Sequence, residues 1–354
     1  MSSSRMNEML SERPLMPADL FKATMEGNSN VLIQRLGLPR GDQNDIQVRI
    51  EPSELRCATR FGDTFLHLLA MKHDNLALIV FKKDMSLLRA CNKKLETPLH
   101  CASKVGNAVI IRDFIRHARN VVRDALGITN ENRETALHVA ARHNNIEGVL
   151  ALMTLDPEAA YKEDMRGFSP FYIAIVEGYT SLVLRMLETD PTLACTQFSD
   201  GMFPVHVAAR VDKDNARLVE HILQAYRDAA VLLDPCGKNL FHMAAERGHT
   251  HMFTREFALR ENEPNDNLQI SQMVENMINV KDYEGNTPFH IAAMKGYSSV
   301  MKVIWERLND DQREVKNQKG ETAFDLSVIQ VKNTNKSVMN LQQNIVVSLS
   351  CATP

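Results

Sequence analysis

The sequence predicts an all-α repeat solenoid, and two observations carry this prediction. The first is a six-residue block that recurs eight times, at residues 62–67, 95–100, 133–138, 167–172, 201–206, 237–242, 285–290 and 320–325. The last residues of successive blocks lie 33, 38, 34, 34, 36, 48 and 35 positions apart. The second is that segments with the apolar spacing of a half-buried helix follow the blocks, as in 181–187 and 299–305. Regular repetition at such a period is typical of solenoids.

Each block combines residues that start a helix after a tight turn. Most blocks begin with glycine, which permits the positive φ that such a turn needs. A threonine that can cap the helix follows at 64, 97, 135, 287 and 322, and proline fits the first helical turn at 98, 170, 204 and 288. Left-handed residues are expected to end these helices at Gly106, Gly178, Gly248 and Gly296, with Asn144 as a substitute. Paired alanines allow neighbouring helices to approach closely at 140–141, 208–209, 244–245 and 292–293.

A period near 33 with a T-P-L-H-x-A core resembles the ankyrin repeat. The resemblance covers about residues 57–330 and implies an ankyrin-repeat array of helix–turn–helix pairs with β-turn, or hairpin, fingers. It also implies that the recurring histidine orders the turn by hydrogen bonds. Histidines at this position are His67, His100, His138, His206, His242 and His290.

The pattern divides the chain into four parts. We expect a disordered N-terminus at 1–16, a capping helix pair with its connector at 17–56, the repeat domain at 57–330, and a C-terminal tail at 331–354. The repeat domain holds about seven full repeats and a partial last one. A long insertion lies near 261–273 and a short one at 212–215. A long loop in a compact array is functional or disordered, and we favour a mobile loop or a lengthened helix pair for 261–273.

Composition and motifs argue against catalysis and cofactors. The formal net charge is −3, which does not favour nucleic-acid binding. The six cysteines are widely spaced, and histidines one repeat apart cannot converge on a metal. No nucleophile, phosphate-binding or dinucleotide motif is present, so we expect no enzyme, no cofactor, no metal and no small-molecule substrate. No apolar run is long enough to span a membrane, and the N-terminus lacks a signal-peptide core, which favours a cytoplasmic protein.

Two sets of side chains are candidates for binding a protein partner. The positions before each helix-ending glycine carry six basic and two acidic residues, a charge that favours a partner with an acidic segment. The alternative is that solvated helix ends carry Lys and Arg because of the helix dipole. From this set we select Lys104, Arg142, His143, Arg210, Glu246, Arg247 and Lys295. Turn tips add Arg166, Phe168, Met202, Lys238, Tyr283 and Glu284, although packing between turns could also explain Phe168 and Met202. We further predict that reversing Arg142, Arg210 and Lys295 weakens binding without changing the melting temperature.

The order of features is similar to one plant family. An L-x-K-A-x-x-x-G-N segment at 20–28 precedes a connector, a G-D-T-x-L-H repeat, and later D-x-x-G-x-x-P repeats. A final G-N-T-P-x-H-I-A-A and a G-x-T-A-x-D follow, at 285–293 and 320–325. This order resembles the accelerated-cell-death type of plant ankyrin proteins, which implies a role in salicylate-linked immunity and cell-death control.

In that family a multi-pass membrane domain follows the last repeat, whereas here 29 residues follow Asp325. The resemblance thus implies a protein-binding module in plant immune signalling, whose partners include full-length membrane-bound relatives. We expect it in the cytoplasm, associated with the plasma membrane through such partners. Two alternatives stay open. One is the cytoplasmic regulatory part of a channel-like protein, and the other is an inhibitor that masks a transcription factor.

Overall fold

The structure is a computed structural model that describes residues 13–26, 55–72, 75–211, 216–254 and 276–333. Contacts divide the chain into two compact units, Met1–Thr189 and Asp190–Pro354, called unit 1 and unit 2 below. The described residues form α-helices and short 3₁₀-helices joined by turns. Among them, β-structure is limited to single bridges such as Ala58–Thr64. The predicted all-α repeat fold is confirmed.

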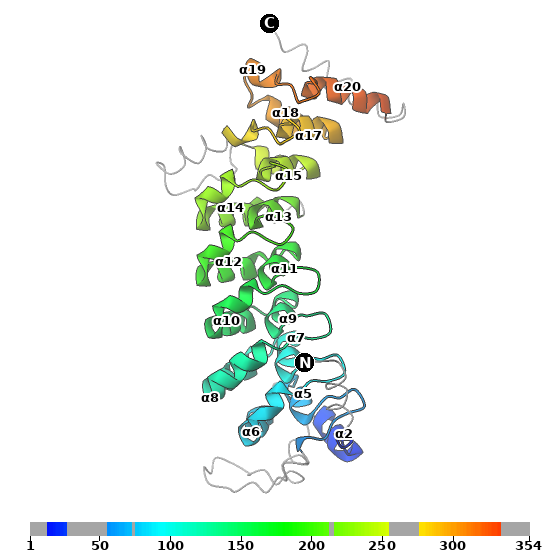
Figure 1. Cartoon of the computed structure of the whole chain (residues 1–354), viewed down its shortest axis with the longest axis vertical. Helices are drawn as coiled ribbons and strands as arrows, with labels where there is room; N and C mark the ends of the chain where they lie inside the picture. Colours follow the sequence, from blue (N-terminus) through cyan, green and yellow to red (C-terminus); the bar gives the residue numbers. More distant parts are fainter. Residues whose placement is uncertain (1–12, 27–54, 73–74, 212–215, 255–275, 334–354) are drawn as a thin grey trace. The chain divides into compact units, whose positions relative to one another are not determined.

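Unit 1 holds four helix pairs whose members lie in two columns (Figure 1). The first helices are α5 (Phe65–Ala70), α7 (Pro98–Lys104), α9 (Ala136–Arg142) and α11 (Pro170–Val176). The second helices are α6 (Asn75–Lys83), α8 (Ala108–Leu126), α10 (Ile146–Leu155) and α12 (Thr180–Thr189). The 3₁₀-helices η1 (Met85–Arg89) and η2 (Pro157–Tyr161) follow α6 and α10. First helices pack on first helices and second on second, and α2 (Ala18–Glu26) contacts α5.

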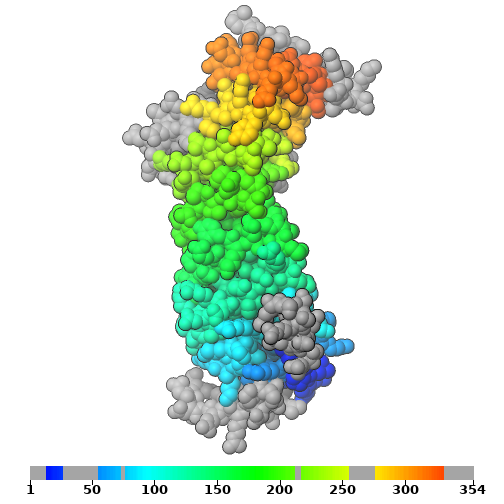
Figure 2. Space-filling model, in the orientation of Figure 1, coloured from blue at the N-terminus to red at the C-terminus, as the bar shows by residue number. Residues whose placement is uncertain are grey.

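Unit 2 repeats this arrangement. The first helices are α13 (Pro204–Arg210), α15 (Leu240–Arg247) and α17 (Pro288–Lys295), and α20 (Ala323–Asn333) packs on α17. The other elements of these repeats are η3 (Pro191–Cys195), α14 (Ala216–Ala225), η4 (Arg227–Val231), η5 (Thr250–Phe253), α18 (Ser298–Trp305) and α19 (Asp310–Arg313). Within each unit the sequence colours follow one another over the surface (Figure 2), because each repeat packs on its neighbours.

The predicted helix boundaries are confirmed at the residues that set them. Proline occupies the first turn of α7, α11, α13 and α17. Positive φ angles occur at Gly106, Gly178, Gly248 and Gly296, and Asn144 has a φ of 52°. The paired alanines are almost completely buried. The turns also impose positive φ on two residues that are not glycine, Leu95 at 61° and Arg133 at 58°.

The spacing of 38 between His100 and His138 has a structural explanation. Helix α8 is interrupted where α10 ends, since Ala118 corresponds to Asp156 (φ −145°, ψ 91°), but the helical segment after this break is longer than the 3₁₀-helix η2. Its backbone leaves the helical region at Ala118 (φ −151°, ψ 61°) and then continues as a further helical segment to Leu126. Val122, Ala125 and Leu126 of this segment are buried, so the additional residues extend the core of unit 1.

Several predicted features lie outside the described residues. They are most of the N-terminus, the second half of the cap and connector, the insertion at 261–273, the short insertion at 212–215 and the tail from 334. Helix α2 is the described part of the predicted cap, and the predicted domain boundaries stay predictions. Among the described helices, none is both long and apolar enough to cross a bilayer.

In six repeats, the recurring histidine joins the first helix to the backbone of the following repeat. In His100, Nδ1 lies 3.1 Å from the main-chain nitrogen of Thr97 and 2.8 Å from its Oγ1, while Nε2 lies 3.0 Å from the carbonyl oxygen of Glu134. The other five make the same pair of contacts, with Nε2 on a carbonyl oxygen 26 to 44 residues further along the chain. These side chains therefore supply an inter-repeat hydrogen bond in both units.

The partners fix the tautomer and the charge of these rings. A main-chain N–H can only donate and a carbonyl can only accept, so Nδ1 is unprotonated and Nε2 carries the proton. Burial lowers the pKa of all six histidines, to about 4 for His67, His138 and His242. Both ring nitrogens are thus occupied and the rings are neutral near pH 7, which confirms the structural role expected for them.

Acid should destabilise the fold through these histidines. Their pKa values are lower in the folded than in the unfolded chain, so the unfolded chain binds more protons between about pH 6.5 and 4 and stability falls as the pH falls through that window. The loss is on the order of 3 kcal/mol for each of His67, His138 and His242. Urea unfolding at a series of pH values measures it. A free energy of unfolding that stays constant from pH 6.5 to 4 would contradict this assignment.

Two glycines with the same backbone conformation should differ in their tolerance of alanine. A Cβ on Gly201 (φ +78°) would lie 2.3 Å from Cγ of Pro235, whereas a Cβ on Gly106 (φ +77°) meets no atom within 4 Å. Gly106→Ala should cost about 1 kcal/mol of backbone strain. Gly201→Ala should cost at least about 2 kcal/mol, because Pro235 must also move. Chemical denaturation compares the two variants, and equal losses would show that the Pro235 contact is unimportant.

Candidate functional site

The fingers that precede the first helices are held by a side chain at their first position. One side-chain oxygen accepts hydrogen bonds from the main-chain N–H groups two and four residues later. The residues that do so are Asn92, Asn130, Asp164, Asp234, Asp282 and Asn317. This is the Asx-turn chemistry that favours Asn and Asp in turns. Asn or Asp three residues before the first residue of a block is the sequence signal that could have located these residues.

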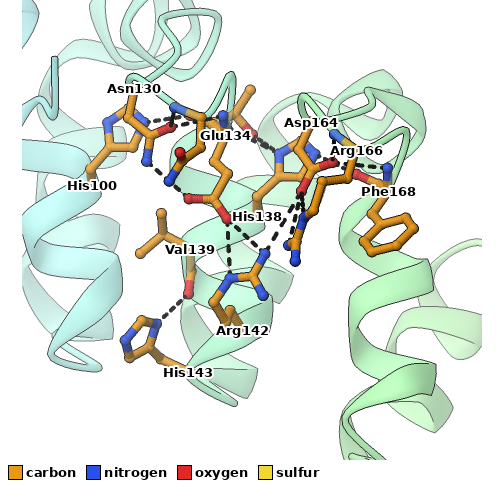
Figure 3. A network of polar contacts seen from close by, with 12 residues as sticks. His100, Asn130, Glu134, His138, Val139, Arg142, His143, Asp164, Arg166 and Phe168 are labelled. Carbon is orange, nitrogen blue, oxygen red and sulfur yellow. Dashed lines mark hydrogen bonds and ion pairs between the residues drawn. The ribbon is translucent and has the colours of Figure 1, made fainter. Parts of the chain in front are cut away.

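A polar network joins two fingers and the end of α9 in unit 1 (Figure 3). The guanidinium group of Arg142 donates to Oε1 of Glu134, with nitrogen–oxygen distances of 2.6 and 3.1 Å, and its Nη2 lies 3.8 Å from Oδ2 of Asp164. Arg166 lies 3.2 Å from the same Asp164 oxygen. Two arginines and two carboxylates thus balance one another, so the network adds no net positive charge to this face.

Burial makes this network structurally important. The side chains of Glu134 and Asp164 are 10% and 2% exposed. Burial alone would raise the pKa of Glu134, but hydrogen bonds from Asn130 and Arg142 outweigh it and lower the pKa. At Asp164, main-chain N–H groups and Arg166 likewise outweigh burial and lower the pKa. Both carboxylates are ionised near pH 7 and need Arg142 and Arg166 beside them. These contacts argue against the prediction that Arg142 can be reversed without changing the melting temperature, because reversal removes the cation that pairs with Glu134.

A smaller set of charges links two repeats in unit 2. Glu246 lies 4.0 Å from Nζ of Lys238 and 3.9 Å from Nζ of Lys295. These three candidates come from a finger and from the ends of α15 and α17. One carboxylate between two ammonium groups leaves a net charge of +1 here.

The remaining candidates divide into exposed and packed side chains. Lys104, His143, Arg210, Arg247 and Glu284 are exposed, and Tyr283 is 66% exposed. Phe168 is half-buried, stacked on Tyr172 at 4.4 Å with the guanidinium of Arg166 above its ring. Met202 is buried, with its sulfur 3.1 Å from Nη1 of Arg210. Packing within the turns therefore explains Met202, and its expectation as an exposed tip is wrong.

The described residues offer no arrangement suited to metal chemistry. Within these ranges, no group of three or more His, Cys, Asp or Glu side chains could hold a metal ion. Burial raises the pKa of Cys91 and Cys101, which disfavours a thiolate. The six block histidines use both ring nitrogens in hydrogen bonds. What the geometry offers instead, in each unit, is a hydrogen-bonded frame that displays the exposed side chains of helix ends and finger tips.

Two arginines at equivalent helix ends should respond differently to alanine. Arg142→Ala leaves Glu134 and Asp164 with less compensation for their buried charge, so we expect a loss of about 3 kcal/mol in unfolding free energy. Arg247 is exposed and forms no ion pair with the residues described, so Arg247→Ala should change stability by less than about 0.5 kcal/mol. Urea unfolding measures both, and a neutral Arg142→Ala would contradict the structural role of the network.

Comparisons with known proteins agree with this geometry. Residues 205–314 match the family model for ankyrin repeats, in three copies. An ankyrin repeat-containing protein of Arabidopsis thaliana is 31% identical over 103 residues, which are 28% of this chain and 20% of that protein.

Neurogenic locus notch homolog protein 1 is also similar to part of the chain. The zebrafish protein is 28% identical over 142 residues and the human protein is 27% identical over 139 residues. These matches cover 39% and 38% of this chain but only 5% of each notch protein. Together with the helix pairs, the fingers and the histidine hydrogen bonds, the family match shows that this chain carries an array of ankyrin repeats.

Proposed function

We propose that the chain is a non-enzymatic module that binds protein partners through the concave face formed by finger tips and first-helix ends. Ankyrin repeats generally bind protein partners. The single observation that carries the proposal is that buried and exposed polar groups have different roles. Buried titratable groups are used to hold the fold, as in His138 and the Arg142 network, while exposed side chains of varied chemistry are displayed on it.

The charge of this surface favours an acidic segment in the partner. Once Arg142 is removed from the set, Lys104, Arg210 and Arg247 remain as exposed cations without ion pairs among the described residues. Such cations accelerate association with an acidic partner, and they do so most strongly at low salt. A full-length membrane-bound relative is one candidate partner.

We place this module in plant immune or cell-death signalling, in the cytoplasm and next to the plasma membrane through its partners. The order of motifs supports this setting, and the similarity to the Arabidopsis protein agrees with a plant ankyrin-repeat protein. A second candidate function, which the family resemblance suggests, is the cytoplasmic regulatory part of a channel-like membrane protein. A third is an inhibitor that masks a transcription factor.

Charge reversal at the helix ends tests partner binding. In tissue that produces the chain, tagged Lys104→Glu/Arg210→Glu/Arg247→Glu should recover at least about tenfold less of the proteins that co-purify with the wild type. The control reverses three exposed lysines elsewhere, Lys82, Lys302 and Lys316, and should recover the same proteins as the wild type. Melting temperatures check that all three chains fold.

Equal recovery by the two triple variants would reject these helix ends as the binding site. The biological setting has its own readout, since disrupting the gene should change pathogen-induced cell death. A normal response would contradict the immune role. A native species heavier than 40.0 kDa that stays with membranes would favour the channel-like alternative.

A further inference from the structure

The finger tips of unit 1 carry a concentration of positive charge that the finger tips of unit 2 do not. The three tip positions of each finger are 60–62, 93–95, 131–133 and 165–167. They hold five cations and one anion, a net charge of +4 in a chain whose formal charge is −3. In unit 2 the same positions (199–201, 235–237, 283–285 and 318–320) hold one cation and two anions. Because turns of the same type occur in both units, turn geometry does not require this charge.

Most of these cations take no part in holding the fold. Arg60, Lys93, Lys94 and Arg133 are exposed, and none forms an ion pair with any residue that the structure describes. The fifth cation, Arg166, differs from them because it pairs with the buried carboxylate of Asp164. Four of the five charges are therefore free for a partner.

Exposed apolar side chains lie at the first and the last finger of this row. Phe61 is 73% exposed and Met165 is 62% exposed, among the most exposed large apolar side chains described. Aromatic residues and methionine are enriched in protein interfaces, where they act as anchors in pockets of the partner. The row thus has an apolar anchor in its first and in its fourth finger, with cations between them.

Main-chain hydrogen bonds fix the tips relative to one another. The N–H of Lys93 donates to the carbonyl of Phe61 at 2.9 Å, and Glu131 donates to Lys94 at 3.1 Å. Met165 then donates to Asn132 at 2.9 Å. The finger backbone is therefore already ordered before a partner binds, so binding costs little of its conformational entropy.

The same row holds the strained turns. Leu95 and Arg133 occupy left-handed backbone positions where the other six blocks have glycine, and a residue with a Cβ is disfavoured there by roughly 1–2 kcal/mol. Strain of this kind is common at functional sites. Arg133 places a cation at the finger tip, whereas a glycine at this position would carry no charge.

We propose that Arg60, Phe61, Lys93, Lys94, Arg133 and Met165, called the tip strip, bind an acidic protein segment that inserts apolar side chains beside Phe61 and Met165. This inference rests on the proposed protein-binding function and names the finger-tip residues of unit 1 that would contact the partner. Charge complementarity selects an acidic partner, and the two anchors favour a protein over a polyphosphate, which offers no pocket for a thioether.

A peptide-display selection tests the tip strip. The full chain is the bait for a random 16-residue peptide library, and the affinities of the selected peptides are measured by fluorescence anisotropy. We expect the selected peptides to be rich in Asp and Glu and to contain apolar residues. Arg60→Glu/Lys93→Glu/Lys94→Glu/Arg133→Glu should weaken their binding at least about tenfold, mainly through slower association. Phe61→Ser/Met165→Ser should weaken it through faster dissociation.

The matched control reverses four exposed lysines outside the strip: Lys82, Lys302, Lys316 and Lys319. It changes the net charge by the same amount and should bind the peptides nearly as tightly as the wild type. Circular dichroism and melting temperature confirm that each variant folds. If both quadruple variants lose a comparable amount of peptide affinity, net charge alone explains the loss, and the proposal is overturned.

Two further outcomes would also overturn it. Selected peptides that are not acidic, or that bind the strip variants as tightly as the wild type, would reject the strip while leaving the protein-binding function intact. Strip-dependent sedimentation with phosphatidylserine-containing vesicles, without binding of acidic peptides, would identify a membrane surface instead. If the selection yields no binder and no protein co-purifies from tissue, the proposed function fails together with the strip.

Discussion

The hydrogen bonds made by one imidazole in most repeats are the interaction on which the rest of the structure depends. Each of these rings accepts a hydrogen bond from the start of its own helix and donates one to the finger of the following repeat, as in His100. It thereby links local helix geometry to the packing of neighbours, which is the contact that stabilises repeat proteins. The ring can do this only when neutral and in the Nε2-protonated form. That requirement explains why burial of these histidines is tolerated and why they are unavailable for catalysis or metal binding.

A division between fold and function follows from this constraint. Buried polar groups are satisfied within the frame, including Glu134 and Asp164, whose charges are balanced by Arg142 and Arg166. Function is left to the outer surface, where side chains can vary without changing the turns. Unit 1 uses that freedom to place cations and two apolar anchors at its finger tips, whereas unit 2 carries Tyr283 and acidic residues at the same positions.

Sequence reasoning succeeded where a local rule decides the structure and failed where a distant contact does. The block period, the prolines and the left-handed Asn144 follow from local backbone chemistry, and the structure confirms them. Arg142 looked like a solvated cation because its partners, Glu134 and Asp164, come beside it only when the fingers fold. Met202 was misplaced for the same reason, since its burial depends on the packing of the turn. At Leu95, the repeat imposes a left-handed backbone conformation that the leucine side chain disfavours, so local propensity alone would not have predicted it.

The central claim is most directly tested by the protonation state of the six block histidines. Nitrogen NMR of the chain labelled in its imidazole rings distinguishes protonated from unprotonated nitrogens at each site. At pH 6, we predict an unprotonated Nδ1 and a protonated Nε2 for His67, His138 and His242, because burial lowers their pKa to about 4. The opposite tautomer, or titration near pH 6.5 as in an exposed histidine, would contradict the account.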